Sequence, residues 1–267
     1  MKRIFITGAS SGIGLATAKR LTSAGHEVWG TSRDQARLPP LAHFHPVVLD
    51  LARSDSITTA FKQALNEAGH FDVVINNAGS GHFGSSESLP NELLREQFQI
   101  LVFGQIGLCT VALQAMRQHG SGLLINVSSL AARLPVPYMG AYNAAKAAMA
   151  SFTLTLQLEL KSSDVRVVDL QPADIRTSFN DVVQRSDSMS SGEQARIDHA
   201  WNIVDQNMRA APSPEIVARQ IARLIEQPNP PPLVTVGGFF QAIIAPFVFR
   251  LLPQRVRVWG LKKYYKL

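Results

Sequence analysis

The sequence predicts a single α/β domain with a doubly wound parallel sheet, Rossmann-like, and helices on both faces. Apolar runs of strand length alternate with segments of helical period along most of the 267 residues. A glycine-rich turn stands between the first apolar run and the first helical segment. The chain is 46% hydrophobic and 17% charged, which is ordinary for a globular protein with a large core.

The predicted strands are continuously apolar rather than alternating, as in a sheet that is covered on both faces. They are Arg3–Thr7, Glu27–Thr31, Pro46–Leu49, Phe71–Ile75, Gly122–Val127, Arg166–Leu170 and Leu233–Val236. The predicted helices between them are Ile13–Ala24, Ser56–Ala68, Glu92–Met116, Ala144–Leu160 and Pro214–Ile225. Right-handed crossovers then give the doubly wound order, and ligands bind at the carboxyl ends of the strands.

The turn after the first strand has the spacing G-x-x-x-G-x-G and leads directly into a helix. Glycines let the backbone approach a pyrophosphate, and a helix N-terminus offers free N–H groups. An ordinary strand-to-helix turn is the alternative, which this position in the first βα unit disfavours. The residues expected to hold a dinucleotide here are Gly8, Ser10, Ser11, Gly12, Ile13 and Gly14.

The end of the second strand selects between the two nicotinamide dinucleotides. An NAD site needs an acidic residue near the ribose 2′-hydroxyl, and a 2′-phosphate needs an arginine. Ser32 occupies the expected acidic position and Arg33 follows it, although Asp34 comes next. The planar guanidinium makes two charge-assisted bonds to a phosphate. We therefore expect NADP(H) rather than NAD, with a solvated surface arginine as the alternative reading.

Two further strand ends are expected to line the cofactor site. The third strand ends at Asp50 and Leu51, and the fourth is followed by Asn77, Ala78 and Gly79. Small residues let the ribose and adenine lie against the sheet. The asparagine can hydrogen-bond neighbouring strands and also contact the ligand.

The candidate catalytic residues are Ser129, Tyr142 and Lys146. Ser129 follows the fifth strand, Tyr142 comes thirteen residues later, and Lys146 lies one helical turn beyond it. A free phenol has a pKa near ~10, and a nearby ammonium together with an oxidised nicotinamide favours the phenolate. We therefore expect a lowered pKa for Tyr142, which would exchange a proton with the substrate oxygen that Ser129 holds.

Together these motifs resemble the short-chain dehydrogenase/reductase family, in its single-domain branch, over roughly Lys2 to Thr177. The resemblance implies catalysis by Ser129, Tyr142 and Lys146, with Lys146 also binding the nicotinamide ribose. It also implies cofactor contacts at Gly8, Gly12, Gly14, Asn77, Ala78 and Gly79. Pro172, Ile175 and Thr177 match the loop that contacts the carboxamide end of the nicotinamide.

Two positions depart from the family's pattern. Leu101 stands where the family commonly has an asparagine that holds a water in a proton relay to the lysine. Ala173 replaces the glycine that commonly follows Pro172. Leucine cannot hydrogen-bond, so any relay must use the backbone or another water. Ala173 requires a backbone conformation that is open to residues other than glycine.

The segment from residue 175 to 212 is polar and departs from the strand–helix rhythm, so we interpret it as a substrate lid with a short helix around Glu193–Met208. The tail, residues 237–267, combines an apolar helix interrupted by Pro246 with six cations and no anion: Arg250, Arg255, Arg257, Lys262, Lys263 and Lys266. This pattern favours peripheral membrane contact or a lid over nucleic-acid binding. A face that packs on the body or a second subunit is the alternative.

The sequence thus predicts an NADP(H)-dependent oxidoreductase that moves a hydride between nicotinamide and a carbonyl or alcohol, with a lipophilic substrate favoured by the tail. A dinucleotide-binding sensor or scaffold with little catalysis is the alternative, supported by Leu101; a sugar-nucleotide epimerase would need a larger C-terminal domain. The single cysteine, Cys109, is expected in the core and indicates a reducing compartment, so we expect a cytoplasmic protein. We also expect a homo-oligomer and no metal site.

Overall fold

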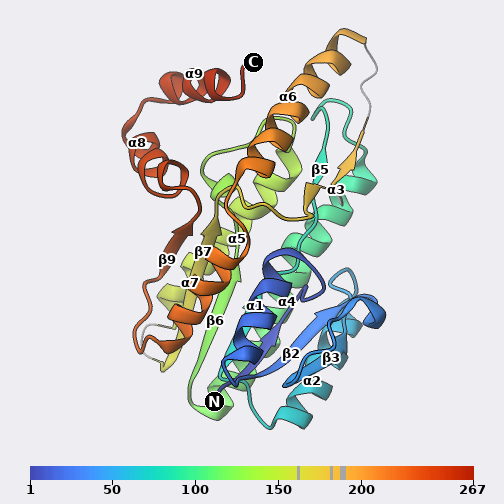
Figure 1. The fold of residues 1–267 in the computed structure, drawn as a ribbon, viewed down its shortest axis with the longest axis vertical. Helices are drawn as coiled ribbons and strands as arrows, with labels where there is room; N and C mark the ends of the chain where they lie inside the picture. The colour runs from blue at the N-terminus through green and yellow to red at the C-terminus, as the bar shows by residue number, and fades with distance from the viewer. Residues whose placement is uncertain (161–162, 181–182, 187–190) are drawn as a thin grey trace.

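The computed structural model describes residues 1–160, 163–180, 183–186 and 191–267. Its centre is a parallel seven-stranded sheet in the order β3-β2-β1-β4-β6-β7-β9 (Figure 1). The strands are β1 (Arg3–Ile6), β2 (Glu27–Ser32), β3 (Phe44–Val48), β4 (Val73–Asn76), β6 (Gly122–Val127), β7 (Val165–Pro172) and β9 (Leu233–Val236). The order reverses between β1 and β4, so the predicted doubly wound sheet is confirmed.

The helices cover both faces of this sheet. They are α1 (Gly12–Ser23), α2 (Ser54–Ala68), α3 (Asn91–Phe98), α4 (Gln105–His119), α5 (Gly140–Glu159), α6 (Ser191–Ala210), α7 (Glu215–Glu226), α8 (Ala245–Leu251) and α9 (Gln254–Tyr264). Short elements complete the chain: η1 (Gln35–Arg37), β5 (His82–Phe83), η2 (Gln99–Gly104), η3 (Leu130–Ala132), β8 (Gln184–Arg185) and η5 (Phe240–Ile244). Each predicted strand and helix corresponds to an observed element.

Successive strand residues point to opposite faces, which explains the continuously apolar strands. Phe5 packs with α2, α4 and α5 on one face, and Ile4 and Ile6 pack with α1 and α7 on the other. Cys109 is fully buried on the first of these faces, as predicted. Burial raises the pKa of the Cys109 thiol to about 12, so it stays protonated and unreactive.

The predicted helix Glu92–Met116 is α3 and α4 joined through η2, a π-helical segment. The joined helix, Asn91–His119, is long and apolar enough to cross a membrane by length and composition alone. Its buried residues Leu108, Ala112 and Met116 lie in the core against the sheet, so it acts here as a core helix. Leu101 lies in the π-helical segment and is fully buried.

The proposed lid contains a longer helix than expected, because α6 extends over Ser191–Ala210. Residues 181–182 and 187–190 of that segment lie outside the described residues. β8, also within the segment, pairs in parallel with β5. The assignment of residues 175–212 as a lid stays a prediction.

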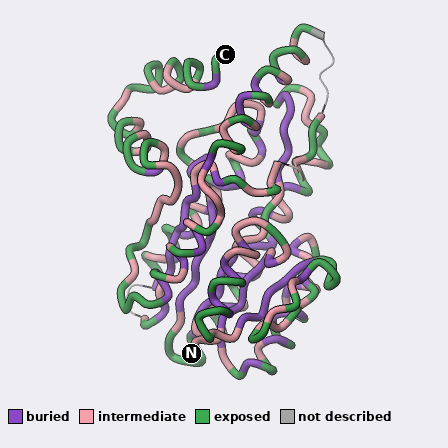
Figure 2. Tube along the Cα trace, in the orientation of Figure 1, coloured by how far each residue is buried: buried purple, intermediate pink, exposed green. Residues whose placement is uncertain are grey.

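The tail leaves the sheet after β9 and forms η5, α8 and α9, which project beside α6 (Figure 1). Pro246 lies in the first turn of α8, directly after the π-helical segment η5. Much of this segment is exposed (Figure 2). Its end is anchored on α6, where Asn207 Nδ2 donates to the Tyr264 hydroxyl at 3.4 Å and Tyr265 is buried.

Candidate active site

A cleft of about 280 Å³ opens at the carboxyl ends of β1, β2 and β4. Most of the predicted cofactor residues line it: Gly8, Ser10, Ser11, Gly12, Arg33, Asp50, Leu51, Asn77, Ala78, Gly79 and Thr177. Ile13 and Gly14 lie beneath this surface instead, and Ile13 packs against the core. Parallel strands thus bring residues from five separate segments to one edge of the sheet.

The glycine-rich turn has the geometry of a close backbone cradle. Gly8 has a φ of 72°, a conformation that L side chains rarely adopt. A Cβ on Gly14 would lie only 2.0 Å from the carbonyl oxygen of Gly8. Side chains at either position would therefore disrupt the tight turn that leads into α1.

Asn77 ties β4 to β1 directly above the cleft. Its Nδ2 donates to the carbonyl oxygen of Thr7 at 2.9 Å, and its backbone N–H donates to the Thr7 hydroxyl at 2.9 Å. The expected bridge between neighbouring strands is therefore present. Because Asn77 also lines the cleft, a ligand there would rest on a rigid strand junction.

Asp34 does not compete with the predicted phosphate site. Its Oδ1 accepts a hydrogen bond from Ala36 N at 2.9 Å and caps the short helix η1. Arg33 is exposed at the cleft, and Arg37 lines the same cleft. Arg37 was not among the residues expected from the sequence, where its signal was its place four residues after Arg33.

Ser129 and Tyr142 line a second, larger cavity of about 440 Å³. Ser129 follows β6, whereas Tyr142 and Lys146 lie on α5. The Lys146 ammonium donates to the carbonyl oxygen of Val127 at 2.8 Å and lies 5.9 Å from the centre of the Tyr142 ring. The three predicted catalytic residues are thus brought together, and Thr177 borders both the cleft and the cavity.

In the protein without a bound nicotinamide, the pKa of Tyr142 is shifted upward and not downward. Burial raises the pKa of Tyr142 to about 12, and a hydrogen bond with Ser129 opposes that shift. Burial also lowers the pKa of Lys146 to about 8, with the charge of Asp169 acting in the opposite direction. Desolvation therefore dominates in the protein without a bound nicotinamide, and the lowering expected when the oxidised nicotinamide is bound stays a prediction.

The paired serines have different partners. The Ser128 hydroxyl donates to the buried carboxylate of Asp169, which also accepts from Gln171 Nε2 at 2.6 Å. Ser129 instead hydrogen-bonds to Tyr142 and accepts from the backbone N–H of Ala131. The geometry therefore favours Ser129, rather than Ser128, as the residue beside a reacting oxygen.

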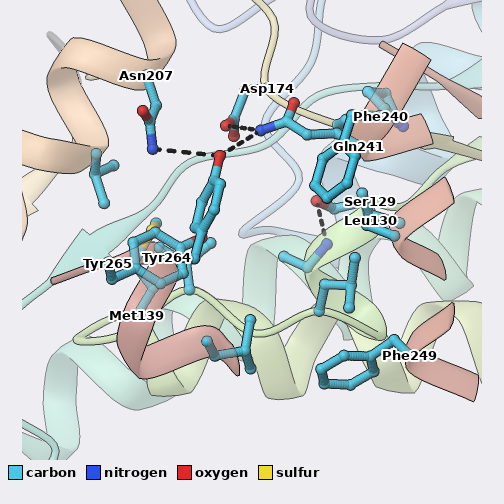
Figure 3. A pocket seen from close by; sticks show the side chains of 18 of the residues that line it. Ser129, Leu130, Met139, Asp174, Asn207, Phe240, Gln241, Phe249, Tyr264 and Tyr265 are labelled. Carbon is cyan, nitrogen blue, oxygen red and sulfur yellow. Dashed lines mark hydrogen bonds between the residues drawn. The ribbon is translucent and has the colours of Figure 1, made fainter. Parts of the chain in front are cut away.

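The rest of the larger cavity is mainly apolar and is walled by the tail. Phe240, Ile244, Val248 and Leu252 contribute to this wall. Four polar residues that are joined by hydrogen bonds interrupt this wall: Asp174, Gln241, Tyr264 and Asn207 (Figure 3). Asp174 was not expected at a site from the sequence, although its place just after β7 was a usable signal.

Comparison with known proteins agrees with this geometry. A family model described as short chain dehydrogenase matches residues 2–188. The chain belongs to the short-chain dehydrogenase/reductase family. It is 32% identical to 3-ketodihydrosphingosine reductase of Bacteroides thetaiotaomicron over 268 residues, 99% of this chain and 98% of the relative. The predicted family and the coarse prediction of an oxidoreductase are confirmed.

Solved structures of short-chain dehydrogenases share the fold. One from Streptomyces avermitilis has a TM-score of 0.83 at 26% identity and covers 100% of this chain and 99% of its own. An alcohol dehydrogenase from Thermococcus sibiricus, complexed with 5-hydroxy-NADP, has a TM-score of 0.74 at 25% identity and covers 90% and 97%. A Brucella melitensis 3-ketoacyl-(acyl-carrier-protein) reductase, complexed with NADH, has a TM-score of 0.71 at 26% identity, covering 84% and 90%. Structures of the family therefore hold both kinds of nicotinamide dinucleotide.

The two departures from the family's pattern have local explanations. The Leu101 side chain lies against Gly79, where an added Cβ would be 3.2 Å from Leu101 Cδ2 and 3.9 Å from Lys146 Nζ. An apolar side chain thus lies close to Lys146. The backbone N–H of Ala173 donates to the Val236 carbonyl at 2.7 Å and continues the pairing of β7 with β9. This extended pairing requires no glycine.

Proposed function

We propose that this short-chain dehydrogenase/reductase is an NADPH-dependent reductase of lipophilic ketones. The observation that carries the proposal is the position of Ser129 and Tyr142 at a cavity of about 440 Å³ with mainly apolar walls. A long hydrocarbon chain fits such a wall because each buried CH₂ group contributes about 0.8 kcal/mol. The similarity to a 3-ketodihydrosphingosine reductase supports the same substrate class.

The residues of the cleft fit a dinucleotide that carries a 2′-phosphate. The cradle at Gly8 and Gly14 leaves no room for side chains, and Arg33 and Arg37 provide two cations at the end of β2 and in η1. The neighbouring acidic residue, Asp34, is engaged in capping η1. The cofactor, when bound, supplies a hydride to the carbonyl carbon.

In the reduction, Tyr142 donates its proton to the carbonyl oxygen that Ser129 holds by hydrogen bond. Because burial raises the pKa of Tyr142 to about 12, the phenol carries this proton at neutral pH. Lys146 supports the phenolate that forms and binds the nicotinamide ribose through its ammonium. Its bond to Val127 fixes the ammonium beside the end of β6, where Ser129 also begins.

The outward side of the tail supports peripheral binding to an anionic membrane. Phe239, Ile243, Phe247 and Leu251 form a stripe at four-residue spacing that does not line the cavity, and each is more than half exposed. The five exposed tail cations complement lipid phosphates: Arg250, Arg255, Lys262, Lys263 and Lys266. A cytoplasmic protein docked in this way would receive a lipophilic ketone next to the cavity wall. We also propose a homo-oligomer, in line with exposed Leu154 and Leu158 on α5.

Kinetics on a homologous series of straight-chain ketones tests the proposed reductase. With NADPH present, kcat/KM should rise by about fourfold per added CH₂ until the cavity is filled. Ile244→Ala should lower kcat/KM for the long ketones only, because Ile244 lines the cavity. Ile243→Ala is the matched control, since the Ile243 side chain is next to Ile244 in the sequence but does not line the cavity.

If kcat/KM does not depend on the chain length of the ketone, the proposed lipophilic substrate class is wrong. Tight NADPH binding without turnover of any ketone, aldehyde or quinone would instead favour the sensor function that Leu101 suggests. Preference for NADH over NADPH in the same assay would contradict the cofactor assignment.

A further inference from the structure

The partly buried carboxylate of Asp174 lines the same apolar cavity as Ser129. Asp174 lies two residues beyond β7, and Ser129 lies two residues beyond β6, its neighbour in the sheet. The register pairs Val127 with Leu170, so these two strand ends run side by side into the same cavity. Figure 3 shows both side chains in the cavity wall. A substrate whose carbonyl meets Ser129 therefore places its neighbouring atoms near Asp174.

The partners of this carboxylate within the described residues are neutral. Its Oδ2 accepts from Gln241 Nε2 at 2.6 Å, and Gln241 Nε2 also lies 2.8 Å from the Tyr264 hydroxyl. Across the described part of the chain, no Lys, Arg or His lies within ion-pair distance of Asp174, and its Oδ1 accepts no hydrogen bond. A carboxylate in such surroundings lacks the cation that usually accompanies burial.

Arg257 is the other charged side chain in the wall of the cavity, and it is engaged elsewhere. Its Nε donates to the Leu252 carbonyl at 2.7 Å, and its Nη2 donates to the Arg250 carbonyl at 3.1 Å. The guanidinium also lies 5.3 Å from the centre of the Phe249 ring. The described walls of the cavity thus combine hydrocarbon, neutral hydrogen-bonding groups and one carboxylate without a cationic partner.

We propose that Asp174 binds a protonated amine of the substrate, a few bonds from the carbonyl that is reduced. The inference rests on the proposed function and narrows its substrate class to lipophilic amino ketones. The ammonium would bind Oδ1 of Asp174 at the polar end of the cavity, and the hydrocarbon chain would lie along the wall formed by η5, α8 and α9. Gln241 acts as a positioning residue, because it holds Oδ2 from the tail.

The same arrangement would help proton transfer. The negative charge of Asp174 raises the pKa of Tyr142, after the larger effect of burial. An ammonium bound to Asp174 would cancel that charge as Tyr142 gives up its proton to the carbonyl oxygen. The amine therefore contributes to the rate as well as to binding, and its loss should lower kcat together with kcat/KM.

The decisive experiment compares two long-chain ketones that differ only in an amino group beside the carbonyl, at a pH below the pKa of the amine. The wild-type protein should prefer the amino ketone by about 30-fold in kcat/KM, as for a desolvated charge pair. In Asp174→Asn the ratio of the two kcat/KM values should fall to near one. Asp205→Asn is the matched control, because it removes a carboxylate from α6 outside the cavity; its ratio should equal that of the wild type.

Binding to the wild-type protein with NADPH gives a second readout that needs no variant. A primary alkylamine should bind at least ~10-fold more tightly than the alcohol of the same chain length in calorimetry. Equal affinity, or equal kcat/KM for the two ketones, would overturn the role of Asp174 and leave the reductase standing. If neither ketone is reduced, the proposed function fails, while the amine–alcohol comparison still tests the carboxylate.

Discussion

The ammonium of Lys146 donates a 2.8 Å hydrogen bond to the carbonyl oxygen of Val127, two residues before Ser129. This bond joins α5 to the end of β6, so the helix that carries Tyr142 and the turn that carries Ser129 are held together. Lys146 is only 4% exposed, and burial lowers its pKa to about 8. Burial therefore makes the charged form of Lys146 less favourable in the folded protein than in water.

Tyr142→Phe should reduce turnover of ketones by about 10³-fold, because the substrate oxygen loses its proton donor. NADPH binding, followed by the fluorescence of the reduced nicotinamide, should be retained. Reduction should be independent of pH around neutrality, since the pKa of Tyr142 is about 12, and alcohol oxidation should accelerate as pH rises. Tyr138→Phe, next to α5 but outside the cavity wall, is the control. Normal turnover in Tyr142→Phe would show that another group is the acid.

Lys146→Met should stabilise the fold at neutral pH while abolishing activity. The pKa of Lys146 lies below its unfolded value, so between pH 8 and pH 10.5 the unfolded chain binds more protons than the folded one. The free energy of unfolding should thus rise with pH across this window by about 3 kcal/mol in the wild type. Denaturant unfolding at several pH values should show this rise, and Lys146→Met should lack it. Lys19→Met, at an exposed position on α1, should behave as the wild type.

Arg33→Ala should weaken NADPH binding by about 2 kcal/mol through loss of charge-assisted bonds to the 2′-phosphate, and should leave NADH binding nearly unchanged. Arg37→Ala should have a smaller effect in the same direction, since Arg37 lines the same cleft. Titration of each variant with both cofactors measures the selectivity. Equal losses for NADPH and NADH would contradict the phosphate assignment.

Leu101→Asn should lower the free energy of unfolding by about 2 kcal/mol, because it places an amide in an apolar cluster with Val102 and Ala145. If a water enters beside Lys146, the pH dependence of turnover should also change. Thermal unfolding and a pH–rate profile measure the two effects. A variant with wild-type stability would mean that the amide finds partners in the folded protein.

Phe247→Glu should abolish salt-sensitive binding to anionic vesicles, because Phe247 lies in the outward stripe of α8 and is 68% exposed. Phe103→Glu, 61% exposed on η2, is the control and should bind normally. Vesicle sedimentation at low and high salt gives the readout. A point substitution is preferable to deleting the chain from Leu233 onward, since that deletion would also remove β9 (Leu233–Val236) from the sheet. If the wild-type protein does not bind vesicles and Phe247→Glu dissociates a dimer, this face of the tail is a subunit interface instead.

The local pattern of residues was sufficient for the sheet and for much of the cofactor cleft. Apolar runs and helical periods are short-range properties, and the turn from Gly8 to Gly14 encodes its own backbone geometry. Because parallel strands end at one edge of the sheet, the positions of the strands predicted that Asn77 and Asp50 would line the same cleft as the first turn. The spacing of Tyr142 and Lys146 likewise placed both on one helical face.

Only the tertiary structure decided which environment surrounds these groups. Desolvation depends on all neighbouring elements, so the direction of the Tyr142 pKa shift could not be read from the position of Lys146 alone. The tail was seen in the sequence as one apolar face, but folding against α6 turned Ile244 into the cavity and left Ile243 outside. The contact of Asp174 with Gln241 joins positions 67 residues apart. Such a pairing arises from packing between distant elements, which no local pattern encodes.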